Sequence, residues 1–246
     1  MKTINKDWPV TSLLDISVDC PSKAGLLRYF QAQIQAKEQT HVVTMNAEMA
    51  YSATEDQAFK DLLNQADIVI PDGIGVVWAL GKQGVKVQRL PGVELVETLL
   101  QTSPSTGLNW AILGSSSATL AALPEALKKR LGEFKAPVYL HNGFFSPDQI
   151  SGIVADINAS QPDVLFVALG VPKQEQFIAQ WRKDLKVPLL MGVGGSFDVL
   201  SGQLKRAPVW MQRMHLEWFY RLLQQPSRWR RMLALPKFVL KVTFSR

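Results

Sequence analysis

The chain has 246 residues, of which 47% are hydrophobic and 20% charged, and its formal net charge is +6. This balance excludes a disordered chain and suits one large globular domain, with or without an appendage. The positive charge is concentrated near the end, because residues 201–246 hold ten Lys and Arg against one acid, Glu217, whereas residues 1–200 hold seventeen against twenty acids. We therefore expect the last part of the chain to meet an anionic partner.

Cysteine usage and hydropathy indicate a reducing compartment. Cys20 is the only cysteine, so no intramolecular disulfide can form. The first residues lack the unbroken apolar run of a signal peptide, and no stretch approaches the ~20 apolar residues that span a bilayer. We expect a cytoplasmic protein.

Short apolar runs alternate with helical patterns along most of the chain. The runs predict strands at residues 41–45, 67–70, 108–114, 137–141, 163–170 and 187–195. A helical pattern follows each of the first five runs, and the first of these covers residues 47–64. Alternation of this kind predicts an α/β fold with a Rossmann-like, doubly wound, mainly parallel sheet that has helices on both faces.

The character of the chain changes after Gly202, where no further strand is predicted. Prolines divide the remainder into short helices near residues 209–223 and 227–235. We therefore predict a Rossmann-like catalytic domain at residues 1–204 and a basic, aromatic α-helical appendage at residues 205–246.

The segment EWFYRLLQQPSRWRR, residues 217–231, combines aromatic side chains with four arginines. Trp210, Met214, Trp218 and Leu222 recur every four residues, which predicts that one helical stripe packs on the domain. The arginines need another partner. Basic, aromatic tracts bind single-stranded nucleic acid and also suit anionic lipid headgroups, so the residues alone leave both partners open.

Polar and glycine residues follow the predicted strands, where ligands bind in open parallel sheets. Asp72 comes directly after the run DIVI, and a shielded carboxylate there can act as a general base or can cap the next helix. The loops LGSSSATL and GVGGSFD can offer N–H groups to phosphate, although their glycines equally suit tight turns.

Several enzyme classes are disfavoured by missing motifs. The chain has no G-x-G-x-x-G after its first strand, no phosphate-binding G-x-x-x-x-G-K-[ST], no G-x-S-x-G, and no metal-ligand spacing among its three histidines. Carboxylate, amide and hydroxyl chemistry remains, which suits a metal-independent transfer in which a base deprotonates an acceptor hydroxyl. The alternative is a non-enzymatic module that binds nucleotides or nucleic acid.

Five motifs in this order resemble the WecG/TagA/CpsF glycosyltransferases, glycosyltransferase family 26: TMNAE, PDGIGVVW, RLPGVEL, GVPKQE and GVGGSFDVLSGQLKRAP. The resemblance runs from about residue 10 to Arg231. It implies the GT-E type of Rossmann-like fold and an inverting, metal-independent enzyme with no cofactor. Such enzymes move N-acetylmannosaminuronate or N-acetylmannosamine from UDP to N-acetylglucosamine on undecaprenyl pyrophosphate. The final segment most resembles the uronate transferases that convert lipid I to lipid II of enterobacterial common antigen; the teichoic acid or capsule type is the alternative.

The resemblance also implies roles for particular residues. Asp72 would be the general base, with Thr44 and Asn46 beside it. The residues expected to bind the substrate and UDP are Gln174, Arg89, Gly114, Asn142, Gly143, Gly194, Gly195, Ser196 and Asp198. Arg221, Arg228 and Arg231 would meet the pyrophosphates at the membrane.

The expected partners follow from the same resemblance. They are a UDP-sugar donor, the lipid-linked acceptor and the inner face of the cytoplasmic membrane, to which the protein would bind peripherally, and nucleic acid is not among them. A second copy of the chain is a further candidate.

Overall fold

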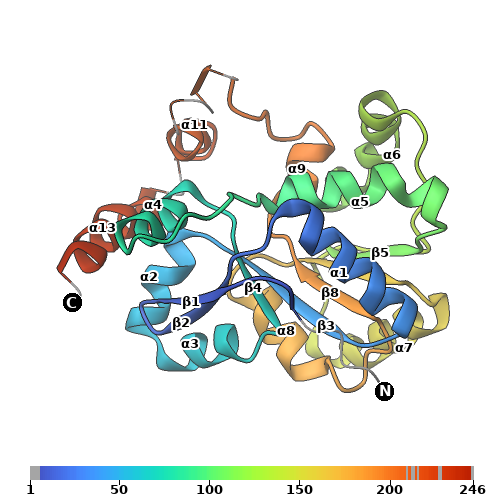
Figure 1. Ribbon diagram of the computed structural model, residues 1–246. Helices are drawn as coiled ribbons and strands as arrows, with labels where there is room; N and C mark the ends of the chain where they lie inside the picture. The colour runs from blue at the N-terminus through green and yellow to red at the C-terminus, as the bar shows by residue number, and fades with distance from the viewer. Residues whose placement is uncertain (1–5, 209, 212–213, 215, 227–228, 245–246) are drawn as a thin grey trace.

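The computed structural model describes residues 6–208, 210–211, 214, 216–226 and 229–244, and it has a six-stranded parallel sheet at its centre (Figure 1). In spatial order the strands are β4 (Ile68–Pro71), β3 (Thr40–Met45), β8 (Leu189–Gly192), β7 (Val164–Ala168), β5 (Trp110–Gly114) and β6 (Tyr139–His141). All six predicted strands are present and every neighbouring pair is parallel. The predicted α/β class is therefore confirmed.

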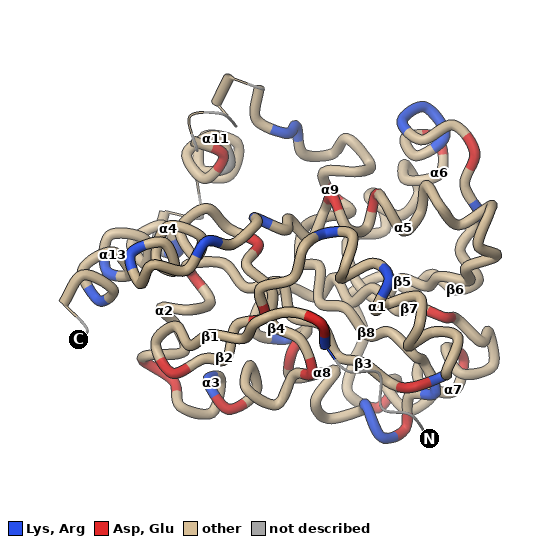
Figure 2. Tube along the Cα trace, in the orientation of Figure 1, with Lys and Arg blue, Asp and Glu red and all other residues tan. Residues whose placement is uncertain are grey.

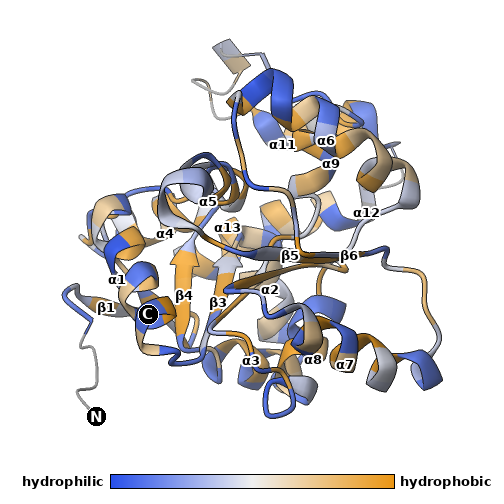
Figure 3. Ribbon diagram, turned by 90° about the vertical axis from the view of Figure 1, so that its right-hand side faces the viewer, coloured by the Kyte–Doolittle hydropathy of each residue, from blue (hydrophilic) through white to orange (hydrophobic). Residues whose placement is uncertain are grey.

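Helices cover both faces of this sheet. One face packs against α1 (Lys23–Ala36), α5 (Gly92–Thr106), α6 (Ser117–Leu131) and α9 (Ser196–Leu200). The other face packs against α2 (Ala47–Glu55), α3 (Gln57–Asn64), α4 (Ile74–Lys82), α7 (Ile150–Ser160), which follows the short 3-10 helix η1 (Pro147–Gln149), and α8 (Lys173–Trp181). Figure 3 shows β4 hydrophobic along its length, whereas the surrounding helices also carry hydrophilic residues.

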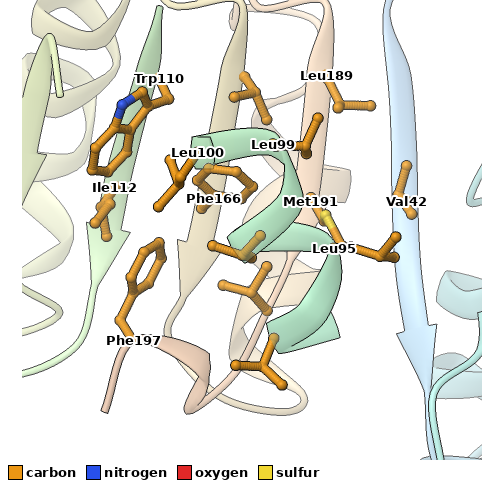
Figure 4. Packing of buried hydrophobic residues seen from close by; sticks show 14 of the residues in the cluster. Val42, Leu95, Leu99, Leu100, Trp110, Ile112, Phe166, Leu189, Met191 and Phe197 are labelled. Carbon is orange, nitrogen blue, oxygen red and sulfur yellow. The ribbon is translucent and has the colours of Figure 1, made fainter. Parts of the chain in front are cut away.

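Successive residues of each strand enter different cores, because strand side chains alternate between the two faces. On β5, Trp110 and Ile112 point into the core beneath α5, while Ala111 and Leu113 point toward α7 and α8. Figure 4 shows Phe166 in the α5 core, together with side chains of α5 itself. This alternation explains why the strands read as continuous apolar runs.

An N-terminal hairpin, which the sequence analysis did not predict, covers the edge strand β4. It consists of β1 (Val10–Leu13) and β2 (Ile16–Asp19). Asp19 Oδ2 accepts a hydrogen bond of 2.9 Å from Val69 N on β4. The hairpin thereby occupies backbone groups that an edge strand would otherwise expose.

Three further differences from the predicted elements concern helices. Helices α1 and α5 were not predicted. The single helix expected at residues 47–64 is broken at Asp56, which ends α2 and caps α3 by accepting a hydrogen bond from Phe59 N.

The C-terminal part contains α11 (Glu217–Gln224), α12 (Trp229–Met232) and α13 (Ala234–Phe244), and no strand among its described residues. Helix α13 runs past the predicted end at residue 235, because Pro236 lies in its first turn, where the missing N–H costs little. Phe238 is 1% exposed and packs with residues of α2 and α4, and Figure 1 shows α13 beside these two helices. Helix α13 therefore shares a core with the sheet domain, and the division at residue 204 stays a prediction.

The stripe expected to pack on the domain is largely exposed. Trp210, Met214 and Trp218 are 59%, 62% and 41% exposed, so that prediction is wrong for these three side chains. Helix α11 instead docks through polar groups: Lys205 N donates to Gln224 Oε1 at 2.9 Å, and Gln224 Nε2 donates to the carbonyl of Lys205 at 2.8 Å. Among the helices that the structure describes, none has the length and apolar composition to cross a bilayer.

Candidate active site

A pocket of about 240 Å³ lies at the carboxyl ends of β4, β3, β8 and β7. Parallel strands bring these ends to one edge of the sheet, so residues far apart in the sequence meet there. The predicted site residues that line the pocket are Thr44, Asn46, Asp72, Arg89, Gln174, Gly194, Gly195, Ser196 and Arg231.

Asp72 stands at the end of β4 and faces the start of another helix. Its Oδ1 accepts a hydrogen bond of 3.0 Å from the N–H of Gly92, the first residue of α5. The alternative that Asp72 caps the next helix is wrong, because α4 begins at Ile74 with Gly73 as its N-cap and has no side-chain cap; Asp72 instead accepts from the first N–H of α5. The positive end of α5 favours the ionised carboxylate, which is the form that a general base requires.

Thr44 and Asn46 follow β3 and each makes a structural hydrogen bond as well as lining the pocket. Thr44 Oγ1 donates to the carbonyl of Gly192 at 3.1 Å and so joins the ends of β3 and β8. Asn46 Oδ1 accepts from Met49 N at 3.0 Å and caps α2. A Cβ at Gly92 would lie 3.2 Å from Thr44 Oγ1, which explains the small residue at that place.

Gln174, at the start of α8, fixes the glycine loop after β8. Its Oε1 accepts from Gly194 N at 2.9 Å, and its Nε2 donates to Glu175 Oε1 at 2.8 Å. Gly192 has no room for a side chain, because a Cβ there would lie 2.7 Å from Gln174 Nε2. The loop of Gly194 and Gly195, which the sequence analysis assigned to UDP, is thus held from below by Gln174.

Glu175 was not singled out by the sequence analysis. It is 1% exposed, and its Oε2 has no hydrogen-bond partner among the described residues. Burial raises the pKa of this carboxyl to about 7, although the hydrogen bond from Gln174 opposes the shift. The burial of this carboxyl behind the pocket wall results from the fold and cannot be seen in the sequence. The only sequence signal was that Glu175 belongs to the motif GVPKQE.

Two arginines and Glu217 join the tail helix α11 to the rim of the pocket. Arg89 Nε donates to the carbonyl of Asp72 at 3.0 Å, and Arg89 Nη2 pairs with Glu217 Oε2. Arg206 Nε lies 3.5 Å from Glu217 Oε1, and Arg206 Nη2 bonds Glu94 Oε1 at 2.5 Å. Burial opposes the charge of Arg206, but Glu94 and Glu217 together raise its pKa. The sequence analysis noted Glu217 as the one acid of the tail without seeing this role, and it missed Arg206.

Of the three arginines predicted to meet the pyrophosphates, the structure describes the side chain of Arg231 only. Arg231 lines the pocket about half-exposed, and its Nε lies 3.6 Å from Glu48 Oε1. Arg228 and the side chain of Arg221 lie outside the described part of the chain. The predicted roles of all three stay predictions.

Four predicted residues lie beside the pocket and do not line it: Gly114, Asn142, Gly143 and Asp198. They gather near the ends of β5 and β6, where Gly143 N donates to the carbonyl of Ser115 at 2.9 Å. Asp198 Oδ1 accepts from Thr119 Oγ1 at 2.8 Å. A Cβ at Gly195 would lie 3.2 Å from Asp198 Oδ2, so this second region adjoins the pocket.

Comparison with known proteins places this site in a family. Residues 11–246 match the family described as "Glycosyl transferase WecG/TagA/CpsF family". The N-acetylglucosaminyldiphosphoundecaprenol N-acetyl-beta-D-mannosaminyltransferase of Bacillus spizizenii is 40% identical over 203 residues, which cover 82% of this chain and 77% of the relative. The protein of the same name from Bacillus subtilis (strain 168) is 35% identical over 202 residues, covering 82% and 78%. The resemblance seen in the five motifs is confirmed, and the chain belongs to the WecG/TagA/CpsF family of glycosyltransferases.

Proposed function

We propose that the protein transfers N-acetyl-D-mannosaminuronate from UDP to the N-acetylglucosamine of an undecaprenyl diphosphate carrier, as in enterobacterial common antigen synthesis. The observation that carries the transferase assignment is Asp72, a helix-capped carboxylate on the wall of the pocket. The names of both relatives support the lipid-linked acceptor. They also favour a second candidate donor, UDP-N-acetylmannosamine, because both names specify the mannosaminyl group.

The proposed reaction is a single displacement at the anomeric carbon. Asp72 takes the proton of the acceptor hydroxyl, and the hydroxyl oxygen forms the new bond to that carbon. The bond from the anomeric carbon to the UDP oxygen breaks, and UDP leaves with the electron pair, so the configuration inverts. The N–H of Gly195 and nearby arginines would balance the charge on the leaving diphosphate, while the N–H of Gly194 holds the loop on Gln174.

We further propose that the tail rests on the inner face of the membrane, where the lipid-linked acceptor is found. Exposed apolar side chains of α11 and α13 support this proposal: Trp218, Phe219, Leu223, Val239, Leu240 and Phe244. Lysines also lie on α13, as Lys237 and Lys241, and at the end of α4, as Lys82; the basic positions of the chain are blue in Figure 2. Apolar side chains beside basic ones suit an anionic lipid surface.

A transfer assay separates the candidate donors. The full-length protein is given UDP-N-acetylmannosaminuronate or UDP-N-acetylmannosamine, with an N-acetylglucosaminyl diphospholipid in vesicles, and product formation is measured. We expect faster transfer from the uronate donor. Transfer from UDP-N-acetylmannosamine alone would replace the donor assignment, and transfer from neither donor would contradict the proposed function.

A further inference from the structure

The carboxylate of Glu217 stands where two arginines converge beside the pocket. Glu217 is the only acid among residues 201–246, and it pairs with Arg89 and Arg206. The three side chains are only 18%, 30% and 24% exposed, so water screens their charges less than at an open surface. The Glu217 carboxylate therefore offsets the repulsion between the two guanidinium groups.

The charges around the two arginines balance only while Glu217 is present. Arg206 has a second carboxylate partner, Glu94, at 2.5 Å. Arg89 forms an ion pair with Glu217 and donates a hydrogen bond to the backbone carbonyl of Asp72. Removing Glu217 would leave two guanidinium groups facing one carboxylate, which favours the entry of another anion.

The Glu217 carboxylate lies close to Asp72, the proposed general base. Arg89 bonds the backbone of Asp72, and Glu217, Arg89 and Asp72 all line the same pocket. The Glu217 carboxylate thus occupies a place on the pocket wall that an anionic group of a bound ligand can reach. Planar, bidentate binding of carboxylates and phosphates is what arginine does best.

We propose that Arg89 and Arg206 form an anion-binding subsite for the UDP-sugar, which Glu217 fills in the state described here and leaves when the ligand's anionic group enters. The identity of the ligand rests on the proposed function. The anionic group is either the diphosphate or the sugar carboxylate, and both share the chemistry that two arginines recognise. Because Glu217 begins α11, the exchange releases the N-terminal end of that helix from the rim of the pocket.

The test measures binding to the full-length protein and to its Glu217→Gln variant. Glutamine keeps the shape of the side chain and removes the competing charge. We expect the variant to bind at least about fivefold more tightly, at the lower end of typical coupling between two sites. Isothermal titrations use UDP, UDP-N-acetylmannosaminuronate, UDP-N-acetylmannosamine and inorganic pyrophosphate. An equal gain for all four ligands assigns the subsite to the diphosphate, and a gain for the uronate donor alone assigns it to the sugar carboxylate.

Two further variants sharpen the result. Glu97→Gln breaks the ion pair with Arg130 at the surface, does not touch the pocket, and should leave every affinity unchanged. Gln224→Ala removes the other anchor of α11 without changing any charge, so it should also tighten binding, but less. Unchanged or weaker binding of every ligand in Glu217→Gln would overturn the proposal, whatever the Gln224 variant shows.

The outcomes separate this inference from the proposed function. If the pyrophosphate affinity rises in Glu217→Gln while no UDP ligand binds either protein, the anion subsite stands and the proposed function fails. If UDP ligands bind the unaltered protein and Glu217→Gln gains nothing for any ligand, the function stands and the subsite is refuted.

Discussion

Asp72 is held by hydrogen bonds through its N–H, its carbonyl and one carboxylate oxygen. The partners are Met45 O, Arg89 Nε and Gly92 N. Such anchoring fixes the carboxylate at the end of β4 without requiring its negative charge, because an amide oxygen can accept the hydrogen bond from Gly92 equally well. The proposed base function of this residue can therefore be separated from its structural function by one substitution.

For Asp72→Asn we expect turnover to fall by a factor on the order of 10²–10⁴, since a positioned general base contributes about that much. The affinity for UDP should stay near normal, and the melting temperature should change little because the cap on α5 survives. Steady-state kinetics and calorimetric titration measure both quantities. Asp148→Asn, which alters an exposed aspartate of η1 outside the pocket, is the control. Comparable turnover in the two variants would refute the base assignment.

Glu175 makes the stability of the protein depend on pH. Its pKa is about 7 in the folded protein against an ordinary value of 4.5, so between these values the folded chain binds more protons than the unfolded chain. The free energy of unfolding therefore falls as the pH rises through this interval. His41 acts in the opposite direction, because burial lowers its pKa to about 4 and its contribution is lost as the pH falls below 6.5.

Glu175→Gln should remove the first effect and leave the second. We expect the variant to gain on the order of 2–3 kcal/mol relative to the unaltered protein between pH 5 and pH 8. Urea unfolding at both pH values measures the gain, and the comparison cancels the contribution of His41. A constant difference between the two proteins across this range would contradict the buried, protonated carboxyl.

At the scale of elements, α11 and α13 attach to the sheet domain in different ways. Helix α11 docks its polar side, through Glu217 and Gln224, and exposes Phe219 and Leu223. Helix α13 docks its apolar side, with Phe238 in the core of α2 and α4. Helical spacing alone predicts apolar docking for both, so it failed for α11, where ion pairs and backbone hydrogen bonds decide the orientation.

Two phenylalanines of α13 provide a matched test of its docking. Phe238→Ala should cost about 3–5 kcal/mol, because it leaves a cavity beside Gly75 and Ala47. Phe244→Ala should change the free energy of unfolding by less than about 0.5 kcal/mol, because that side chain is 78% exposed. Chemical denaturation compares the two variants. Equal stabilities would show that α13 does not share the core.

The six central strands were predictable because each is a short apolar run, and five of them are buried on both faces, whereas β6 at the edge of the sheet is only partly buried. The hairpin β1–β2 was not, since its turn places Leu14 and Asp15 at positive φ without the usual glycine or asparagine. Helix α5 buries seven of its fifteen residues at helical spacing and keeps Glu94, Glu97 and Gln101 on the other side, so its amphipathic pattern was present in the sequence and was overlooked. In the site, strand-end residues such as Asp72 were found from topology. The cluster of Arg89, Arg206 and Glu217 was not, because Arg89 and Glu217 are 128 positions apart and meet only in the fold.

The whole molecule divides its charge and its exposed apolar surface unevenly. The tail carries a local charge of +9 over residues 201–246, and it also holds most of the large exposed hydrophobic side chains of the described chain. On α11, Phe219 and Leu223 are four residues apart and share a side. That side differs from the one bearing Glu217 and Gln224, so it can meet a lipid surface while the helix stays docked.

Vesicle flotation tests this arrangement. We expect the unaltered protein to float with anionic phospholipid vesicles at low salt and to bind less at high salt, where charges are screened. The double variant Phe219→Ser, Leu223→Ser should float less at every salt concentration without losing stability, because both side chains are exposed. Equal flotation of the variant and the unaltered protein would contradict a membrane-facing α11.

The tail is fastened at two points, by the hydrogen bonds of the Gln224 side chain to the backbone of Lys205 and by Phe238 in the core. Glu217 therefore never moves far from Arg89, and its effective concentration at the two arginines is about that of a short intramolecular tether, in the millimolar range or above. A free anion must exceed that concentration to take its place. A nucleotide sugar gains binding energy elsewhere in the pocket, so it can displace Glu217 at far lower concentration. In this way the tether would let the subsite bind the nucleotide-sugar donor and keep it from binding the inorganic phosphate of the cell.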